Sequence, residues 1–200
     1  MGRRSDHSRE ELRSLMLEEG RRLMGEVGFH RFSARKVAER VGYSVGTLYN
    51  VFETLDALVM AINTRTFTAW TAFMSEALDR AGRRDRIAVL VQAYFDFAQA
   101  NPNLWMAIFD HRLPPGMVMP EDERAERAKL GAIAEAEISR ALDRPIDDRI
   151  VVLARSLVAT VHGHCVLALG GSLAEMGERR PVARALDRVR DSLRVAARGA

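Results

Sequence analysis

The spacing of the apolar residues constrains this chain more than any other feature. From Leu12 onward, apolar side chains recur three and four positions apart, which is the period of an amphipathic α-helix, and no segment shows the strict alternation of a strand. Gly28, Gly42 and the Asn101-Pro102 pair indicate helix ends. The sequence therefore predicts an all-α protein of about nine helices, near residues 12–27, 34–41, 44–52, 54–79, 85–100, 103–113, 121–142, 147–169 and 181–197.

The composition is typical of a globular protein from a reducing compartment. Of the 200 residues 48% are apolar, and Cys165 is the single cysteine, which excludes an intrachain disulfide. The opening MGRRSDHSREELRSLM is charged where a signal peptide would be apolar. Residues 156–174 carry no charge and approach a membrane-spanning length, but His162, His164 and three glycines among them favour a buried interface helix. We expect a cytoplasmic protein that does not enter the membrane.

The excess positive charge lies in the first quarter of the chain. Residues 1–52 contain ten Lys or Arg against seven Asp or Glu, whereas residues 53–200 contain twenty of each. A module that binds a polyanion would place its charge in this way. A net charge of +3 also fits an ordinary solvated surface, so charge alone does not decide between the two.

The segment ARKVAERVGYSVGTLYNVF, residues 34–52, has the spacing of a helix-turn-helix. Ala38 lies four residues before Gly42, and Leu48 lies six residues after it. A small residue lets two helices approach, glycine accepts a left-handed turn, and an apolar residue packs the second helix onto the first. In the DNA-reading form of this motif the second helix enters the major groove. The combined pattern favours that form over a plain helical hairpin.

The second of these helices carries no charge, although 28% of the chain is charged. Gly46 would give the backbone clearance at the phosphates, and Thr47, Tyr49 and Asn50 offer short polar contacts to phosphates or base edges. Attraction that does not depend on base sequence comes from cations outside the helix. The predicted DNA-binding residues are Arg3, Arg4, Ser33, Arg35, Lys36, Ser44, Val45, Gly46, Thr47, Tyr49 and Asn50.

The stretch GFHRFSARKVAERVGYSVGTLYNVFETLDAL resembles the N-terminal domain of TetR-family transcriptional regulators over roughly residues 9–58. Three positions depart from the family pattern: Tyr43 replaces a small aliphatic residue, Val51 an aromatic residue or His, and Leu55 a Lys. Val51 and Leu55 are therefore not predicted to contact DNA. Farther on, LVATVHGHCVLALGG and NPNLWMAIFDHRL resemble the C-terminal domain of the WHG type, with Val161-His162-Gly163 in place of its Trp-His-Gly motif.

The resemblance implies a regulator in two parts. Residues 1–53 would form a three-helix DNA-binding domain, and residues 54–200 an antiparallel helical domain for effector binding and dimerisation. We expect a repressor that forms a homodimer through its last two helices. The dimer would bind a palindromic operator, and a small apolar or aromatic effector would release it from the DNA. The candidate effector-pocket residues are Trp70, Tyr94, Trp105, Phe109 and His162.

Two other functions compete with this one. A metal- or redox-responsive regulator could sense through Cys165 and the nearby histidines, because His162 and Cys165 lie three apart on one helical face, although no established metal-ligand spacing is present. An enzyme is not expected, since the Asp110-His111 pair has no evident nucleophile and no phosphate-binding glycine loop occurs. The sequence therefore predicts neither a metal nor a cofactor.

Overall fold

The computed structural model describes residues 7–82 and 84–198, and within them the chain forms ten α-helices, one 3-10 helix and no strand. This confirms the predicted all-α fold. The elements are α1 (Arg9–Val27), η1 (Phe29–Arg31), α2 (Ala34–Val41), α3 (Val45–Phe52), α4 (Leu55–Asp79), α5 (Arg86–Ala100), α6 (Pro102–Asp110), α7 (Glu121–Leu142), α8 (Asp148–Leu169), α9 (Ser172–Glu175) and α10 (Pro181–Arg198). Only η1 and the single-turn α9 lack a counterpart among the predicted helices.

The described residues fall into two compact units. The first contains residues 7–66 and 101–124, and the second contains residues 67–100 and 125–198. Helices α4 and α7 therefore contribute residues to both units. The functional boundary expected near residue 53 stays a prediction, and the compact first unit continues beyond it into α4 and also includes α6.

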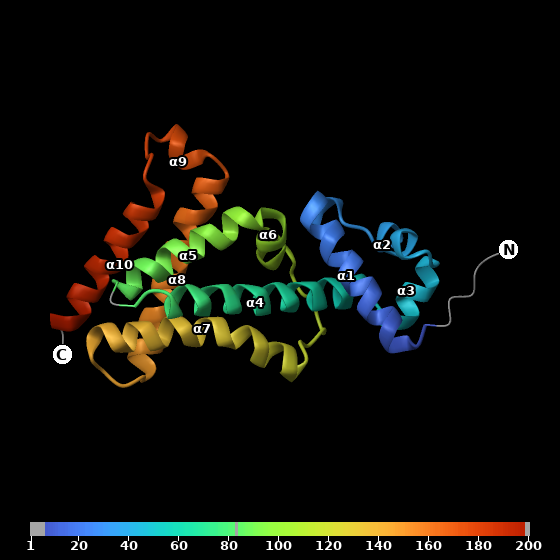
Figure 1. The fold of residues 1–200 in the computed structure, drawn as a ribbon, viewed down its shortest axis with the longest axis horizontal. Helices are drawn as coiled ribbons and strands as arrows, with labels where there is room; N and C mark the ends of the chain where they lie inside the picture. The colour runs from blue at the N-terminus through green and yellow to red at the C-terminus, as the bar shows by residue number, and fades with distance from the viewer. Residues whose placement is uncertain (1–6, 83, 199–200) are drawn as a thin grey trace. The chain divides into compact units, whose positions relative to one another are not determined.

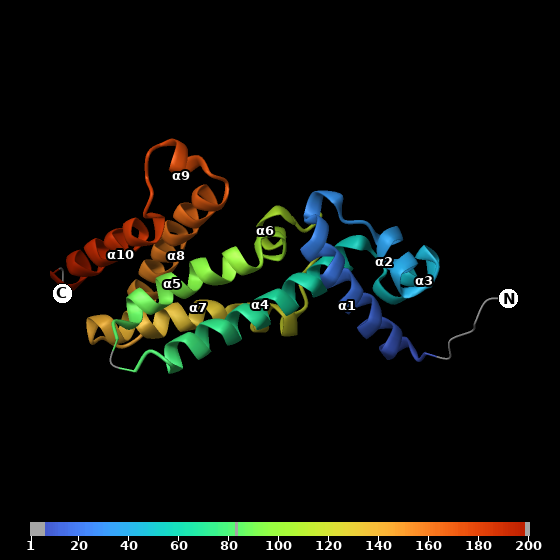
Figure 2. The same cartoon turned by 45° about the horizontal axis from the view of Figure 1, so that its top comes forward.

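The first unit is built on α1, whose start is held by a capping box. Ser8 Oγ accepts a hydrogen bond from the Glu11 backbone N–H at 3.2 Å, and the Glu11 carboxylate accepts one from Ser8 N–H at 2.7 Å. Farther along α1, Gly20 lies where a β-carbon would come within 2.9 Å of Ile62 on α4, so its missing side chain permits this close contact. Figure 2 shows α2 and α3 beside α1.

Helix α6 packs against α1 within the first unit. Leu104 and Ala107 join the same buried cluster as Met24 of α1. The side-chain amide of Asn103 donates to the Gly25 carbonyl at 2.7 Å, and that of the buried Asn63 on α4 donates to the Ala107 carbonyl at 3.1 Å. These polar contacts hold α6 to both α1 and the first part of α4.

A sharp turn separates α3 from α4. Glu53 has φ 64° and ψ −50°, and the Thr54 N–H donates to the Phe52 carbonyl at 2.6 Å, so the chain bends by 67° between the two helices. The Thr54 hydroxyl then accepts from the Ala57 N–H at 3.0 Å and caps the new helix. The helix break expected near Phe52 is therefore present.

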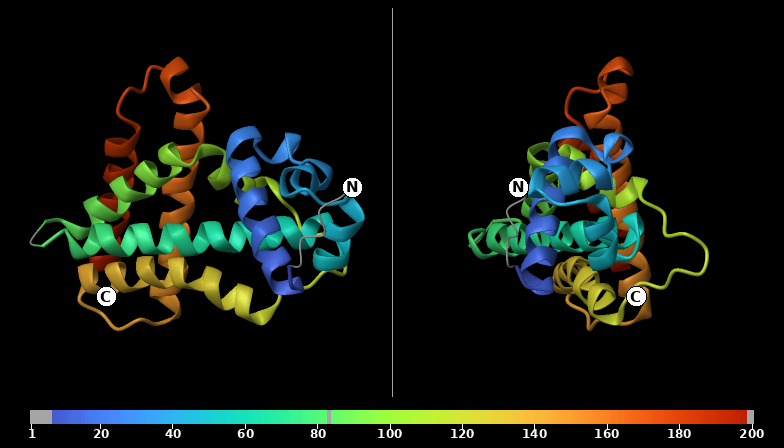
Figure 3. Two further views of the ribbon diagram at one scale, coloured as in Figure 1. Left: turned by 45° about the vertical axis from the view of Figure 1, so that its right-hand side comes forward. Right: turned by 90° about the vertical axis from the view of Figure 1, so that its right-hand side faces the viewer.

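In the second unit α8 packs against both α5 and α10 (Figures 1 and 3). α8 and α10 lie side by side, and the short α9 lies in the connection between them. The buried side chains they share with the neighbouring helices are mostly apolar: Ile87, Val91, Phe95, Ala154, Leu157, Val161, Cys165, Ala185 and Val189. Apolar burial of this kind is the main stabilising contribution to such a bundle.

A buried ion pair ties three helices of the second unit together. Glu137 of α7 is 5% exposed, and its carboxylate accepts from Nε and Nη2 of Arg86 at 2.7 and 2.8 Å. The third guanidinium nitrogen of Arg86 donates to the Leu78 carbonyl of α4 at 2.9 Å. The start of α5 is thus fixed against α4 and α7 by one side chain.

Replacing Arg86 with methionine should destabilise the second unit, because Glu137 would remain buried without its partner. We expect Arg86→Met to lower the free energy of unfolding by about 2–3 kcal/mol. Arg140→Met is the matched control, because Arg140 is 66% exposed and 3.9 Å from the same carboxylate, and should cost less than about 0.5 kcal/mol. Urea denaturation followed by circular dichroism measures both free energies of unfolding. Equal losses in the two variants would contradict a stabilising role for the buried Arg86–Glu137 pair.

Candidate DNA-binding and effector sites

The turn between α2 and α3 has the geometry that the glycine predicts. Gly42 adopts φ 81° and ψ 25°, a left-handed conformation, and its N–H donates to the Glu39 carbonyl at 3.2 Å. The Tyr43 N–H donates to the Ala38 carbonyl at 2.9 Å, which completes a Schellman motif. Ala38 and Leu48 are at most 1% exposed and pack in the core of the unit. The helix-turn-helix arrangement is therefore present.

Helix α3 has a buried apolar face toward the core and an exposed face toward solvent. Leu48 and Phe52 are buried, whereas Val45 is 39% and Tyr49 41% exposed. Gly46 and Asn50 are also exposed, and Thr47 is half-buried. These exposed residues stay predicted DNA contacts, on a face that is open in the chain.

The two serines of the predicted set act as helix caps. Ser33 Oγ accepts from the Lys36 N–H at 3.3 Å, and Ser44 Oγ accepts from the Thr47 N–H at 3.1 Å. Each hydroxyl thus satisfies a helix-end donor that has no partner within its helix. Ser44 Oγ also lies 3.0 Å from the Thr47 hydroxyl, which orients that side chain.

The predicted cations lie outside α3. Arg35 is exposed and pairs with Glu39 at 3.0 Å, a surface contact that contributes little and that a phosphate can replace. Lys36 is exposed on the same helix. Arg3 and Arg4 lie outside the described residues.

Sequence reasoning missed two contacts that residues at and just before the start of α1 make with the helix-turn-helix. Nδ1 of His7 lies 3.0 Å from the Tyr43 hydroxyl, and Nη2 of Arg9 donates to the Asn50 carbonyl at 3.3 Å. The paired residues are about forty positions apart, so no local spacing signals them. His7 and Arg9 join the candidate site on this evidence from the fold.

Three of the predicted effector residues meet inside the second unit. The Trp70 and Tyr94 rings are edge to face with centroids 4.9 Å apart, and the Tyr94 hydroxyl lies 3.0 Å from Nδ1 of His162. Phe97 stacks on Trp70 at 5.4 Å. Burial raises the pKa of the Tyr94 phenol and lowers that of His162, so both groups are held in their neutral forms.

The other two predicted effector residues form a pair in the first unit. Trp105 is fully buried, and its ring lies edge to face with Phe109 at a centroid distance of 5.1 Å. The five residues therefore belong to two separate aromatic groups, one in each unit. Their role in binding an effector stays a prediction.

Cys165 has the surroundings of a structural thiol. It is fully buried, and this burial raises its pKa to about 12, which leaves almost no thiolate at neutral pH. Nδ1 of the neighbouring His164 lies 2.8 Å from the Thr160 carbonyl of its own helix. Among the described residues, no three His, Cys, Asp or Glu side chains gather as metal ligands. Nothing in this arrangement favours sensing through Cys165.

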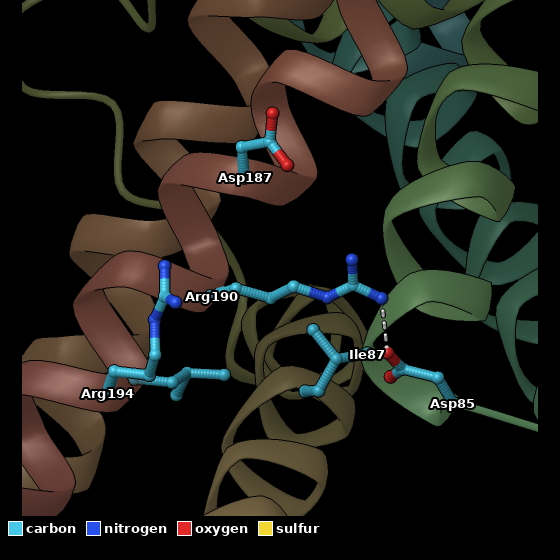
Figure 4. A pocket seen from close by; sticks show the side chains of 6 residues that line it. Asp85, Ile87, Asp187, Arg190 and Arg194 are labelled. Atoms are coloured by element: carbon cyan, nitrogen blue, oxygen red, sulfur yellow. Dashed lines mark hydrogen bonds and ion pairs between the residues drawn. The ribbon is translucent and has the colours of Figure 1, made fainter.

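A surface hollow of about 480 Å³ lies between the start of α5 and α10 (Figure 4). Its lining is mostly charged: Asp85, Ile87, Asp187, Arg190, Leu193 and Arg194. Arg190 donates to the Asp85 carboxylate at 2.6 Å, and this hydrogen bond lowers the pKa of Asp85. No predicted effector residue lines this hollow.

The helix-turn-helix with an exposed second helix defines a DNA-binding protein. Comparison with family models gives the family: residues 16–62 match the model described as bacterial regulatory proteins, tetR family, and residues 87–193 match the tetracyclin repressor-like, C-terminal domain. The chain belongs to the TetR family of DNA-binding transcriptional regulators, which are not enzymes. The finer likeness to the WHG type stays a prediction, because the matching C-terminal model has a different description.

Solved structures share the fold along nearly the whole chain. A Rhodococcus sp. RHA1 protein of unknown function is 24% identical with a TM-score of 0.72, and the match covers 98% of each chain. A TetR-family transcriptional regulator from Streptomyces coelicolor is 20% identical with a TM-score of 0.64, covering 93% of this chain and 98% of that one. RolR in complex with resorcinol is 17% identical with a TM-score of 0.63, covering 95% of each. The search of curated proteins gave no match.

Replacing Gly46 with alanine tests whether this residue serves DNA rather than folding. A β-carbon there would meet only Ser44 Oγ, at 3.6 Å, so the chain itself has room for it. Alanine should then raise the free energy of unfolding by up to about 1 kcal/mol. If phosphates approach this backbone, affinity for a DNA duplex should nevertheless fall by about tenfold.

Gly131→Ala on α7 is the matched control. A β-carbon at Gly131 meets nothing within 4 Å, and the residue is exposed in mid-helix. The Gly131→Ala substitution should therefore stabilise the protein, as measured by thermal unfolding. It should leave the affinity for DNA unchanged, as measured by fluorescence anisotropy. Unchanged DNA binding by Gly46→Ala would exclude the clearance role.

Proposed function

We propose that the protein is a ligand-responsive repressor that acts in the cytoplasm. Two copies bind a palindromic operator through α3, and a small apolar or aromatic effector releases them. The observation that carries the proposal is the Trp70–Tyr94–His162 cluster in the C-terminal unit of a DNA-binding chain. Aromatic surface with few polar groups is typical of small-molecule sites.

The neutral Tyr94–His162 pair suits an effector that bears a hydroxyl group. Both side chains can exchange their mutual hydrogen bond for bonds to a ligand, while Trp70 offers an aromatic face. RolR, which shares the fold, has been solved with the phenol resorcinol bound. Small phenols are therefore the first compounds to test.

The effector would act through its unequal affinity for two arrangements of the dimer. Binding to the C-terminal unit favours one arrangement, and the continuous helix α4, which contributes to both units, transmits the change. The two α3 helices then leave the spacing of one DNA turn, about 34 Å. Repression follows from occupancy of the operator in the absence of effector.

A substitution in the aromatic cluster should weaken the response without weakening DNA binding. Resorcinol and related phenols should raise the melting temperature of the protein. They should also lower its affinity for the DNA upstream of its own gene. His162→Gln should reduce the affinity for the active phenol by about tenfold, because glutamine places its amide near the position of Nε2 and the half-buried Nδ1 is lost. His164→Gln is the matched control and should leave it unchanged, since that ring bonds to its own helix. Equal effects of both variants on phenol affinity would exclude a role for His162 in binding the effector.

The dimer interface is proposed on the outer face of α8 together with α10. Val152, Ser156, Ala159 and Leu167 are exposed in the single chain and follow one another at helical spacing. The helix is long and apolar enough to span a membrane by composition, yet only 28% of its most apolar window is buried. A partner copy that covers this small, apolar surface accounts for both properties, and TetR-family membership favours it over lipid.

Ala159→Arg should convert the dimer into a folded monomer. The exposed alanine lies in the middle of the stripe, and a long cation there would be buried against the partner without a counter-charge. Ala128→Arg, on an exposed position of α7, is the control and should leave the dimer intact. Sedimentation analysis measures the oligomeric state, and fluorescence anisotropy measures the loss of operator binding. A dimeric Ala159→Arg protein would contradict this interface.

A further inference from the structure

Helix α3 ends in a backbone conformation that glutamate rarely adopts. Glu53 has φ 64° and ψ −50°, and the Thr54 N–H donates across it to the Phe52 carbonyl at 2.6 Å. These angles and this hydrogen bond form a γ-turn with positive φ, which is rare and strained. Contacts on both sides hold it, because Phe52 is buried in the core and the Thr54 hydroxyl caps α4. The strain at Glu53 is therefore maintained by its neighbours.

The side chain of Glu53 gains nothing from the fold in return. It is exposed, and no hydrogen bond or ion pair joins its carboxylate to another described residue. The nearby acid Asp56, in contrast, lies 2.9 Å from Nε2 of His111. A carboxylate at the C-terminal end of a helix is also disfavoured, because the helix dipole is negative there. A residue that carries such costs without a compensating contact is expected where function requires it.

The Glu53 carboxylate lies close to the expected DNA surface. The Glu53 N–H donates to the carbonyl of Tyr49 at 2.8 Å, so the two residues are one helical turn apart, roughly 5.4 Å along the axis. Tyr49 is exposed and is a predicted DNA contact. Charges interact over a Debye length of about 8 Å at physiological salt, so phosphates near Tyr49 are within reach of the carboxylate. Residues 42–64 contain no Lys or Arg that could neutralise it locally.

We propose that Glu53 limits the affinity of the protein for DNA. The turn holds its carboxylate at the end of α3, where it repels the phosphates beside the groove. This repulsion is the same for every base sequence, because the phosphate backbone carries no sequence information. The proposal rests on the part of the proposed function in which α3 binds DNA, and not on the effector or the dimer interface.

Glu53→Gln tests the charge, because glutamine keeps the size of the side chain and the backbone conformation. The probes are the duplex that the wild-type protein selects from a random-sequence pool and a second duplex of unrelated sequence. At about 50 mM salt, fluorescence anisotropy should show the affinity for both duplexes rising by about three- to tenfold. The gain should shrink as the salt concentration is raised, because screening shortens the reach of the charge.

Asp143→Asn is the matched control. Asp143 is the other described residue besides glycine with positive φ, at 52°, and it is an exposed acid in the second unit. The substitution removes one negative charge from a comparable backbone position that is not part of the helix-turn-helix. It should therefore leave the affinity for both duplexes unchanged.

Glu53→Gly separates the charge from the strain of the turn. Glycine adopts positive φ without cost, so this variant should melt about 2 to 4 °C above the wild type. Glu53→Gln keeps the strain and should melt within a degree or so of the wild type. If the charge limits binding, both variants should gain the same affinity for DNA despite their different stabilities.

Three results would overturn the proposal. Glu53→Gln could bind DNA no more tightly than the wild type, or Glu53→Gly alone could gain affinity, which would assign the effect to the turn. Glu53→Gln could also bind the selected duplex more weakly, which would indicate that the carboxylate accepts a hydrogen bond from a base such as cytosine. Tyr49→Ala distinguishes these results from failure of the proposed function. It should lose the preference for the selected duplex, and if it keeps that preference, α3 does not read DNA and both proposals are wrong.

Discussion

Two backbone hydrogen bonds hold the turn at Gly42, and the DNA-binding face depends on them. Because the Gly42 and Tyr43 N–H groups both return to α2, the chain leaves that helix at a fixed angle. The left-handed conformation would strain any side chain with a β-carbon. With the angle fixed, Leu48 reaches the core while Tyr49 faces solvent. Tyr43, the residue after this turn, contacts His7 just before the start of α1.

Helix α3 keeps its folding requirements apart from its binding surface. Its stability comes from the cap at Ser44 and the buried Leu48 and Phe52, all of which face the protein. The outer positions are therefore available for binding, and nothing inside the chain excludes a side chain at Gly46 in the first turn of α3. Cations are placed on α2, where Arg35 pairs only with the exposed Glu39. A charge on α3 would add affinity for any sequence, whereas short polar groups discriminate between bases.

The sequence was sufficient wherever structure follows from neighbours along the chain. The caps at Ser33 and Ser44, the turn at Gly42 and the long helices are encoded within a few residues, and their boundaries agree with prediction. Contacts between distant segments were not predictable in this way. Asn103 of α6 meets Gly25 of α1 within the first unit, and His7 just before α1 meets Tyr43. For the same reason, a list of aromatic residues could not show that Trp70 and Trp105 belong to different clusters.

The polar pair in the C-terminal aromatic cluster limits what an effector can be. Tyr94 and His162 contact one another at 3.0 Å, so an entirely apolar ligand that separated them would break their mutual hydrogen bond without replacing it. A ligand with its own hydroxyl can replace the lost bond, since that group both donates and accepts. Burial also lowers the pKa of His162 and so disfavours its charged form. The proposed effector is therefore better described as a neutral aromatic alcohol or phenol than as a hydrocarbon, because the cluster discriminates through the bond that it must give up.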